Sequence, residues 1–307
     1  MAVVLNDASR VIATRRRKTK GEVGANVGVA RIVETIEEAL GEAKVDPSRL
    51  SGIGMGVPGM LNLNTGLLKL APNLGWRDVP LRKVLTRRFH VPVAIANDVD
   101  AGVYGEYRFG SARGARCVVG VFPGTGVGGG CVYEGRILRG KTGSCMEIGH
   151  VPVMPDGTLC GCGRRGCLET VASRLAISAE LAQAVYRGEA PQLKKLAGTD
   201  IANIRSGIIR EAMEAGDRVV ERIVRHAARQ IGRVLIGTVH QLAPDVIVLG
   251  GGLVEEMPAL FVGEITDTLN KGVTETFRGS FKVAAARLGD YATAMGAAAL
   301  ASDLAGA

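Results

Sequence analysis

Aromatic residues are scarce in this chain, at 4% of 307 residues, with a single tryptophan. No stretch of about 20 uninterrupted apolar residues occurs, so we expect no membrane-spanning helix and no membrane partner. The opening MAVVLNDASR lacks a basic segment followed by a long apolar run, which predicts no secretory signal. The six cysteines show no disulfide framework and are typical of a reducing compartment. The sequence therefore predicts a cytoplasmic protein.

Positive charge is in excess but is not concentrated. The net charge is +8, and the basic residues are scattered along the chain, so no nucleic-acid partner is predicted. The densest basic run, residues 15–20, is interpreted as a solvated loop, although such a surplus also attracts nucleotides and other polyanions. Apolar residues make up 47% of the chain, which permits a large core, and the length suggests about two domains.

Strand-like runs and helical periodicity alternate along the chain, and this alternation predicts an α/β fold. Glycine is abundant, at 43 residues, as expected where a backbone turns tightly beside a ligand. The strands are expected at Val3–Leu5, Val11–Thr14, Ile53–Val57, Val91–Ile95, Cys117–Phe122, Gly128–Tyr133, Val246–Leu249 and Phe281–Ala285, and the helices at 28–43, 99–107, 168–187, 217–242 and 290–304.

The segment EIGHVPVMPDGTLCGCGRRGCLE contains a complete set of soft metal ligands. His150, Cys160, Cys162 and Cys167 supply one imidazole and three thiolates, which is a tetrahedral ligand set for Zn²⁺. No position remains for water, so we predict a structural zinc site. Two alternatives stay open: three reduced cysteines with His150 hydrogen-bonded nearby, or a redox pair of Cys160 and Cys162, which lack the usual two-residue spacing.

Two glycine-rich turns follow apolar strands, where ligands of such sheets bind. The first, PGTGVGGG, can turn backbone N–H groups toward an anion, but it matches neither a Walker A motif nor a dinucleotide fingerprint, and a plain hairpin turn is the alternative. The second, in VIVLGGGL, precedes an expected helix and admits a phosphate or a flat ligand, although alone it is a weak signal.

A further polar cluster follows the strand that ends at Ile95. Asn97 and Asp98 open a helix, and Asp98 is either its N-cap or a general base that reaches a substrate hydroxyl. Asp100 is a rival N-cap. Two turn signals, GVPG and PNLGW, lie upstream; Asn73 offers an amide to sugar hydroxyls, and Trp76 is expected to pack in the core.

Taken together, these blocks resemble the ROK (repressor, ORF, kinase) family of sugar kinases and repressors, and most closely its zinc-containing bacterial glucokinases. The matching pieces, in family order, are GVPG, APNLGW, ANDVDAGVYGE, GTGVGGG, EIGH, CGCGRRGCLE and VIVLGGGL. The resemblance implies an actin-like, hexokinase-like (RNase H-like) two-lobe α/β ATPase fold with a small zinc-binding loop. It places the smaller lobe, with the sugar side and the catalytic Asp, at 1–104 plus the C-terminal helix 291–307. The larger lobe, with the zinc loop and the nucleotide-binding glycine loops, is expected at 105–290.

The resemblance also implies the role of each site residue. Asp98 would be the catalytic base of ATP-dependent hexose phosphorylation, with glucose the expected sugar and Mg²⁺ bridging the phosphates. A homodimer or homotetramer is expected. The hexose would be bound by Gly59, Asn73, Asn97, Asp98, Glu147, His150 and Glu169, and ATP by Gly124, Thr125, Gly126, Gly128, Gly250, Gly251 and Gly252.

One family motif is absent from the sequence. Members of the family open with a strand and a D-x-G-G-T hairpin that organises Mg²⁺ and the transferred phosphate, and this chain begins at what resembles the second strand. Either the true start lies upstream or the form is catalytically weak. The alternatives to a kinase are therefore a sugar-binding regulatory protein and, since no helix-turn-helix precedes residue 1, less favourably a DNA-binding repressor.

Overall fold

The computed structural model describes residues 1–141, 143 and 145–306, so Ala307, the last residue of the predicted segment 291–307, lies outside the described residues. The chain divides into two compact units. The first comprises Met1–Arg113, Ile137–Cys145 and Asp290–Ala307, and the second comprises Gly114–Arg136 and Met146–Gly289. None of the described helices combines the length and apolar character needed to cross a membrane.

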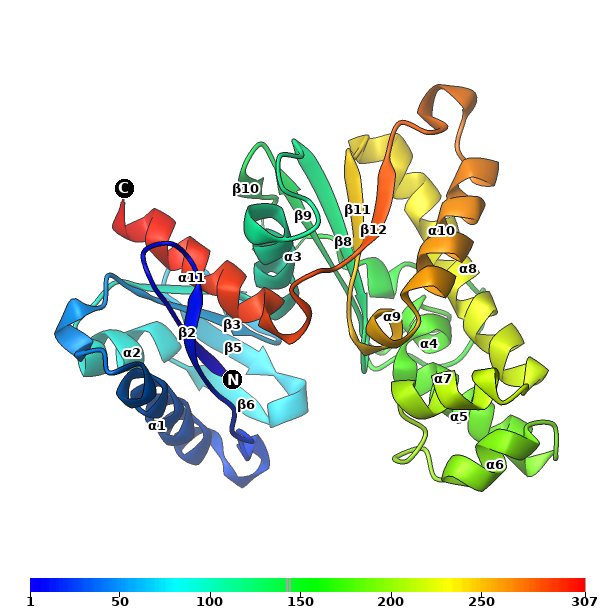
Figure 1. Cartoon of the computed structure of the whole chain (residues 1–307), viewed down its shortest axis with the longest axis horizontal. Coiled ribbons are helices and arrows are strands. Elements are labelled where there is room, and N and C mark those ends of the chain that lie inside the picture. The colour runs from blue at the N-terminus through cyan, green and yellow to red at the C-terminus, as the bar shows by residue number, and fades with distance from the viewer. Residues whose placement is uncertain (142, 144, 307) are drawn as a thin grey trace. The chain divides into compact units, whose positions relative to one another are not determined.

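Short sheets and three long helices build the first unit (Figure 1). β1 pairs with β2 antiparallel, β3 pairs with β7 parallel, and β4, β5 and β6 form an antiparallel sheet. The elements are β1 (Ala2–Leu5), β2 (Val11–Arg15), α1 (Ala25–Ala43), β3 (Ile53–Val57), β4 (Met60–Asn62), β5 (Leu67–Ala71), β6 (Trp76–Val79), α2 (Leu81–Phe89), β7 (Val93–Asn97), α3 (Asp98–Phe109) and α11 (Ala292–Ala305).

Trp76 lies in the core of the first unit. Its side chain is 1% exposed, and its indole Nε1–H donates to the carbonyl of Gly21 at 3.1 Å. A Cβ on Gly28 of α1 would lie 2.0 Å from the indole ring, so the helix approaches the ring through a residue without a side chain. The prediction that Trp76 packs in the core is confirmed.

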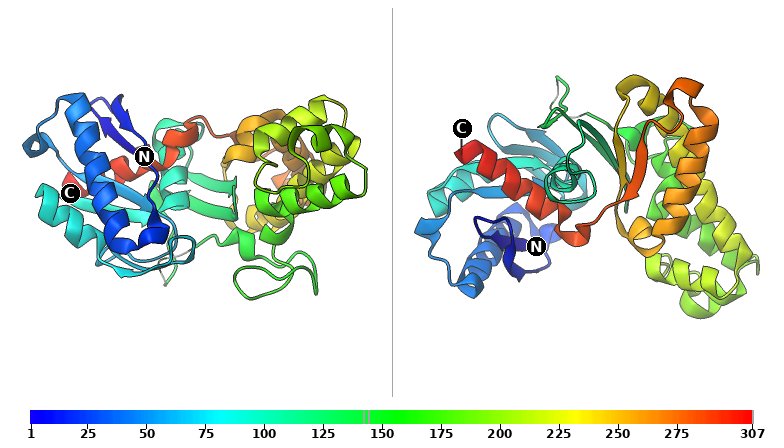
Figure 2. Two further views of the ribbon diagram at one scale, coloured as in Figure 1. Left: turned by 90° about the horizontal axis from the view of Figure 1, so that it is seen from below. Right: turned by 45° about the horizontal axis from the view of Figure 1, so that its top comes forward.

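The C-terminal helix α11 lies against α3 and β3 in the first unit (Figures 1 and 2). Two glycines allow this close crossing, since a Cβ on Gly296 would lie 1.8 Å from the carbonyl oxygen of Ala101, and one on Gly105 would lie 2.3 Å from that of Ala292. Thr293 adds a hydrogen bond from its hydroxyl to the carbonyl of Asp98, at 3.0 Å. The last helix therefore fixes the start of α3.

A mixed five-stranded sheet forms the centre of the second unit. Its order is β10-β9-β8-β11-β12; β8 is antiparallel to β9 and parallel to β11, which is parallel to β12. The elements are β8 (Cys117–Pro123), β9 (Val127–Tyr133), β10 (Arg136–Ile137), α4 (Glu169–Ala172), α5 (Arg174–Tyr186), α6 (Pro191–Ala197), α7 (Ser206–Glu214), α8 (Arg218–Leu242), β11 (Val246–Leu249), α9 (Gly252–Glu256), α10 (Pro258–Gly272) and β12 (Lys282–Ala285).

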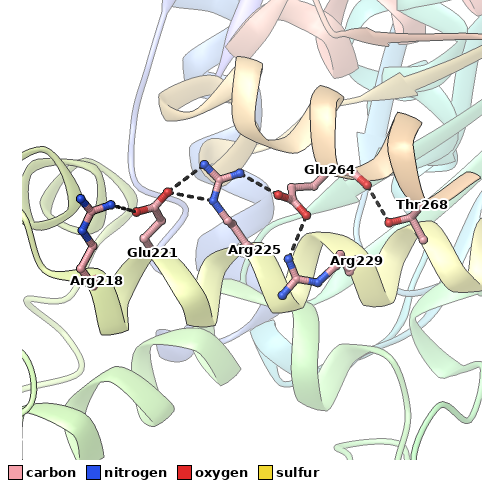
Figure 3. Close-up of polar contacts among 6 residues, drawn as sticks. All are labelled: Arg218, Glu221, Arg225, Arg229, Glu264 and Thr268. Carbon is pink, nitrogen blue, oxygen red and sulfur yellow. Dashed lines mark hydrogen bonds and ion pairs between the residues drawn. The ribbon is translucent and has the colours of Figure 1, made fainter.

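α8 is the long packing helix of the second unit, and its partner is α10. Its apolar stripe, which includes Ile231 and Leu235, is fully buried. On the outer side, Glu264 of α10 accepts hydrogen bonds from Arg225 at 2.7 Å and from Arg229 at 2.9 Å (Figure 3). The two helices are thus joined by an apolar seam and a charged one.

Several expected boundaries differ from the structure, and two of these differences change the architecture. The helix expected at 168–187 is interrupted at Ser173, whose extended backbone ends α4 and whose hydroxyl caps α5 by accepting from the N–H of Ala176. The expected lobe boundary after residue 104 falls inside α3. There, the buried carboxylate of Glu106 accepts from the N–H and hydroxyl of Ser111, which fastens the chain after α3 to the same unit. The assignment of roles to the two lobes stays a prediction.

Candidate active site

The four predicted metal ligands meet in the second unit. The ligand atoms of His150, Cys160, Cys162 and Cys167 all lie within 4.8 Å of one another. The Sγ of Cys160 is 3.7 Å from the Nδ1 of His150, and the Sγ atoms of Cys162 and Cys167 are also 3.7 Å apart. A tetrahedral ion with sulfur ligands at ~2.3 Å separates those ligands by roughly 3.8 Å. The donor set and its spacing therefore fit zinc.

Backbone hydrogen bonds hold the cysteine loop in shape. The N–H of Cys160 donates to the carbonyl of Arg164 at 2.8 Å, and the N–H of Gly163 donates to the carbonyl of Cys160 at 2.9 Å. Gly166 has a φ of +72°, and a Cβ there would lie 1.7 Å from the carbonyl oxygen of Met154. The ligand positions are consequently set by the backbone of the loop itself.

The thiols of the cysteine cluster differ in their pKa values. Burial raises the pKa of Cys160 to about 12, whereas the backbone N–H of Arg164 lowers the pKa of the exposed Cys162. A thiol must lose its proton to ligate a metal, so metal binding at this cluster releases protons and weakens as the pH falls.

The first glycine turn joins β8 to β9. The N–H of Gly124 donates to the carbonyl of Gly126 at 2.8 Å, and the carbonyl of Gly124 accepts from the N–H of Arg174, the first residue of α5, also at 2.8 Å. Thr125 is exposed at the tip, and Gly128 lies in β9. The segment is a hairpin, as the alternative interpretation of the sequence held, and phosphate binding by it stays a prediction.

Glu169 connects this turn to the metal cluster. Its Oε2 accepts a hydrogen bond from the N–H of Val127 at 3.1 Å, and its Oε1 lies 3.5 Å from the Sγ of Cys160. A Cβ on Gly126 would lie 2.3 Å from Oε2, so a side chain at this position would displace the carboxylate. Sequence spacing gave no sign of this contact, because Val127 and Glu169 lie 42 residues apart.

The second glycine turn lies beside a cavity. β11 ends at Leu249, and Gly250–Gly252 lead into α9, as predicted. Gly251 has a φ of +83°, and a Cβ on Gly250 would lie 2.3 Å from the ring of Phe122. Gly252 borders a cavity of about 1020 Å³ whose other walls come from α5, α7 and α9 and from the segment before α7. This volume suits a ligand of nucleotide size.

In the first unit, Asp98 begins α3 at the end of β7. Burial raises the pKa of Asp98, and a hydrogen bond from the N–H of Val99 partly offsets that rise. The N-cap of α3 is Asn97, whose Oδ1 accepts from the N–H of Val99 at 2.8 Å and of Asp100 at 3.3 Å. The alternatives in which Asp98 or Asp100 is the N-cap of the helix are therefore wrong, although Oδ1 of Asp98 also accepts from the N–H of Val99, at 3.1 Å.

Gly59 and Asn73 are the other residues of the first unit that were predicted to bind sugar. Val57 at the end of β3 pairs with Asn97, which brings the turn before Gly59 beside the start of α3. A Cβ on Gly59 would lie 2.9 Å from the Cα of Ala71, two residues before the exposed Asn73. The predicted site residues Glu147, His150 and Glu169 belong to the second unit, where the exposed Glu147 accepts at its carbonyl from the N–H of His150 at 3.0 Å.

The fold and these sites define an actin-like, sugar-kinase-type α/β protein. The model of the ROK family matches residues 1–304, and the chain belongs to this family. It is 32% identical to the glucokinase of Thermotoga maritima over 97% of this chain and 92% of that protein. It is 28% identical to the xylose repressor of Caldicellulosiruptor bescii over 88% of this chain and 67% of the repressor.

A solved structure extends the comparison. The ROK family glucokinase from Streptomyces griseus, in complex with glucose and AMPPNP, superposes with a TM-score of 0.85. The sequences are 31% identical, and the match covers 98% of this chain and 95% of the other. The predicted resemblance to ROK glucokinases is confirmed.

Proposed function

We propose that this protein transfers the γ-phosphoryl group of ATP to the primary hydroxyl of a hexose, with glucose preferred. The observation that carries the proposal is the contact of Glu169 with the N–H of Val127, because one side chain then serves both a sugar-type site and a phosphate-type turn. The similarity to glucokinases, one of them with glucose and AMPPNP in its structure, supports the choice of substrates.

Asp98 acts as the general base. The hydroxyl oxygen of the sugar attacks the γ-phosphorus, its proton passes to the Asp98 carboxylate, and the bond from phosphorus to the departing ADP oxygen breaks. The raised pKa of Asp98 makes its ionised carboxylate a stronger base than an exposed one. The hydrogen bond from Thr293 to the carbonyl of Asp98 holds the residue in place during this step.

The other polar residues orient the sugar. The carboxylates of Glu147 and Glu169 accept from its hydroxyls, and Gly59, Asn73 and Asn97 are further sugar-binding residues. His150 uses Nδ1, the nitrogen nearest Cys160, toward the metal, so Nε2 stays available for a hydroxyl. A zinc ion at the four ligands would fix the ring orientation of His150.

The two glycine turns hold the nucleotide. Gly124, Thr125, Gly126 and Gly128 offer backbone and hydroxyl donors to the phosphates, and Gly250, Gly251 and Gly252 let the nucleotide approach the backbone closely. Mg²⁺ would neutralise charge on the transferred phosphate.

A second candidate function is sugar-dependent regulation without turnover. The similarity to xylose repressors favours it. Two measurements on the full chain separate the candidates: glucose-dependent ADP release in a coupled assay, and glucose binding by calorimetry. Release supports the kinase, whereas binding without release supports the regulator.

A further inference from the structure

The cavity beside the second glycine turn is lined by three arginines, which sequence patterns did not bring together. Arg174, Arg205 and Arg210 come from the start of α5, the residue before α7, and α7 itself. All three belong to the second unit, as does Gly252, which also lines the cavity. The cavity is therefore complete within that unit.

Within the part of the chain that the structure describes, two of these arginines form no ion pair with a carboxylate. Arg210 is paired with Glu214 at 2.9 Å and with Glu256 at 3.0 Å. Among the described residues, neither Arg174 nor Arg205 forms an ion pair; Arg205 only donates to the carbonyl of Ala202, at 3.2 Å. A positive charge without a partner at a cavity wall favours an anionic ligand.

Arg174 is also tied to the first glycine turn. Its backbone N–H donates to the carbonyl of Gly124 at 2.8 Å, so its position follows that of the turn. A guanidinium at this point forms charge-assisted, often bidentate hydrogen bonds with phosphate oxygens.

The same cavity carries an apolar surface and acidic groups. Leu175 is 48% exposed and Ile201 is 38% exposed, although both are large apolar side chains, and both line the cavity. Glu211 and Glu255 also line it. A nucleoside uses all three features, because its base packs on apolar side chains and its hydroxyls or amine donate to carboxylates. A plain chain of phosphates would be repelled by those carboxylates.

We propose that Arg174 and Arg205 are positioning residues that hold the phosphates of a nucleoside di- or triphosphate, while its base lies against Leu175 and Ile201. This assignment rests on the proposed kinase function for the identity of the donor. It adds two phosphate-holding side chains to the backbone groups of the glycine turns.

The test is calorimetric titration of the full chain with adenosine, ADP and AMPPNP, in the absence of sugar. For Arg174→Gln and for Arg205→Gln we expect the affinity for AMPPNP to fall about tenfold each, equivalent to about 1.4 kcal/mol, because each variant loses a charge-assisted hydrogen bond. The affinity for adenosine should stay unchanged, which also shows that the variants fold. The matched control is Arg187→Gln, whose arginine is paired with Glu189 outside the cavity lining.

Arg174→Lys provides a second check, because it keeps the charge and loses the bidentate geometry. We expect its affinity for AMPPNP to lie between the affinities of the wild type and of Arg174→Gln. Equal losses for adenosine and AMPPNP, or no loss for either, would overturn the assignment. Glucose-dependent ADP release by the wild type is measured separately. AMPPNP binding that depends on the arginines, without hexose phosphorylation, defeats only the proposed function. A wild type that binds no nucleotide overturns both.

Discussion

The carboxylate of Glu169 accepts a hydrogen bond from the backbone N–H of Val127 at 3.1 Å, and its other oxygen lies 3.5 Å from the Sγ of Cys160. One side chain thus contacts the hairpin between β8 and β9 and the thiol of a predicted metal ligand. The shape of the turn and the order of the metal loop are therefore coupled through residue 169.

Glu169→Ala removes this coupling. The N–H of Val127 loses its acceptor and the sugar loses a carboxylate, so we expect glucose affinity to fall about tenfold or more, in line with ~1–3 kcal/mol for an unmade buried hydrogen bond. Calorimetry with glucose measures the effect. Glu189→Ala, which removes a surface carboxylate paired with Arg187, is the control and should bind as the wild type does. Wild-type affinity in Glu169→Ala would contradict the role given to this residue.

The cysteine loop provides a second prediction. Cys162→Ser removes one of four ligands, so we expect zinc content by elemental analysis to fall from about one ion per chain, with weaker glucose binding because His150 loses its anchor. Cys145→Ser, a change outside the cluster, should keep both properties. A metal-poor Cys162→Ser protein that binds glucose normally would show that the ion does not support the sugar site.

Asp98→Asn tests the base. We expect kcat to fall about 10²–10⁴-fold with glucose binding largely retained, as for loss of a general base. In the wild type, kcat/KM should rise with pH through a pKa above the ordinary 3.8, because Asp98 must be ionised to accept the proton. Near-normal turnover in Asp98→Asn would exclude this role.

The same substitution has an expected effect on stability. A carboxyl whose pKa is raised on folding stabilises the protein below its ordinary pKa of 3.8, and that contribution is lost as the pH rises through the raised value. Asp98→Asn should therefore have a higher Tm than the wild type at pH 7, and the difference should shrink as the pH falls toward 3.8. Thermal melts at both pH values measure this. A Tm below that of the wild type at pH 7 would contradict it.

The charged seam between α8 and α10 gives a prediction independent of catalysis (Figure 3). Burial alone would raise the pKa of Glu264, but hydrogen bonds from Arg225 and Arg229 outweigh it and lower the pKa. We expect Glu264→Gln to lower the free energy of unfolding by roughly 1 kcal/mol at pH 7, since both arginines stay partly solvated.

This stabilisation is present above the ordinary pKa of 4.5 and is lost as the pH falls through the lowered value, so the difference between variant and wild type should vanish in acid. Urea unfolding at neutral and acid pH measures it. Glu214→Gln, at a more exposed pair with Arg210, is the control and should change stability less. Equal effects of the two substitutions on the free energy of unfolding would contradict the stabilising role given to the ion pairs of Glu264.

The sequence predicted the strands and helices whose patterns were strong and local. The apolar run Val246–Leu249 became β11, and the periodic segment expected at 217–242 became α8. The sheet of β4, β5 and β6 was missed because its strands are short. Glycines such as Gly66 and Gly75 separate the strands, and in the sequence these glycines indicate turns only. Short strands gain most of their stability from pairing, which local patterns do not show.

The part of the candidate site whose residues lie close together in the sequence could be predicted from their spacing. The ligands from His150 to Cys167 lie within 18 consecutive positions, and the structure brings their ligand atoms together. The cavity arginines Arg174 and Arg205 could not be found this way, because they lie 31 positions apart on separate elements and only the packing of α5 against the segment before α7 makes them neighbours. The hydrogen bond between Glu169 and Val127 could not be found from the sequence for the same reason, because these residues also lie far apart in the chain.

The most direct test is a coupled assay of ADP production by the full chain with ATP, Mg²⁺ and glucose, with Asp98→Asn as the blank. We expect ADP formation that depends on glucose and is nearly abolished in Asp98→Asn. Glucose binding by the wild-type chain with no ADP above the blank would contradict it.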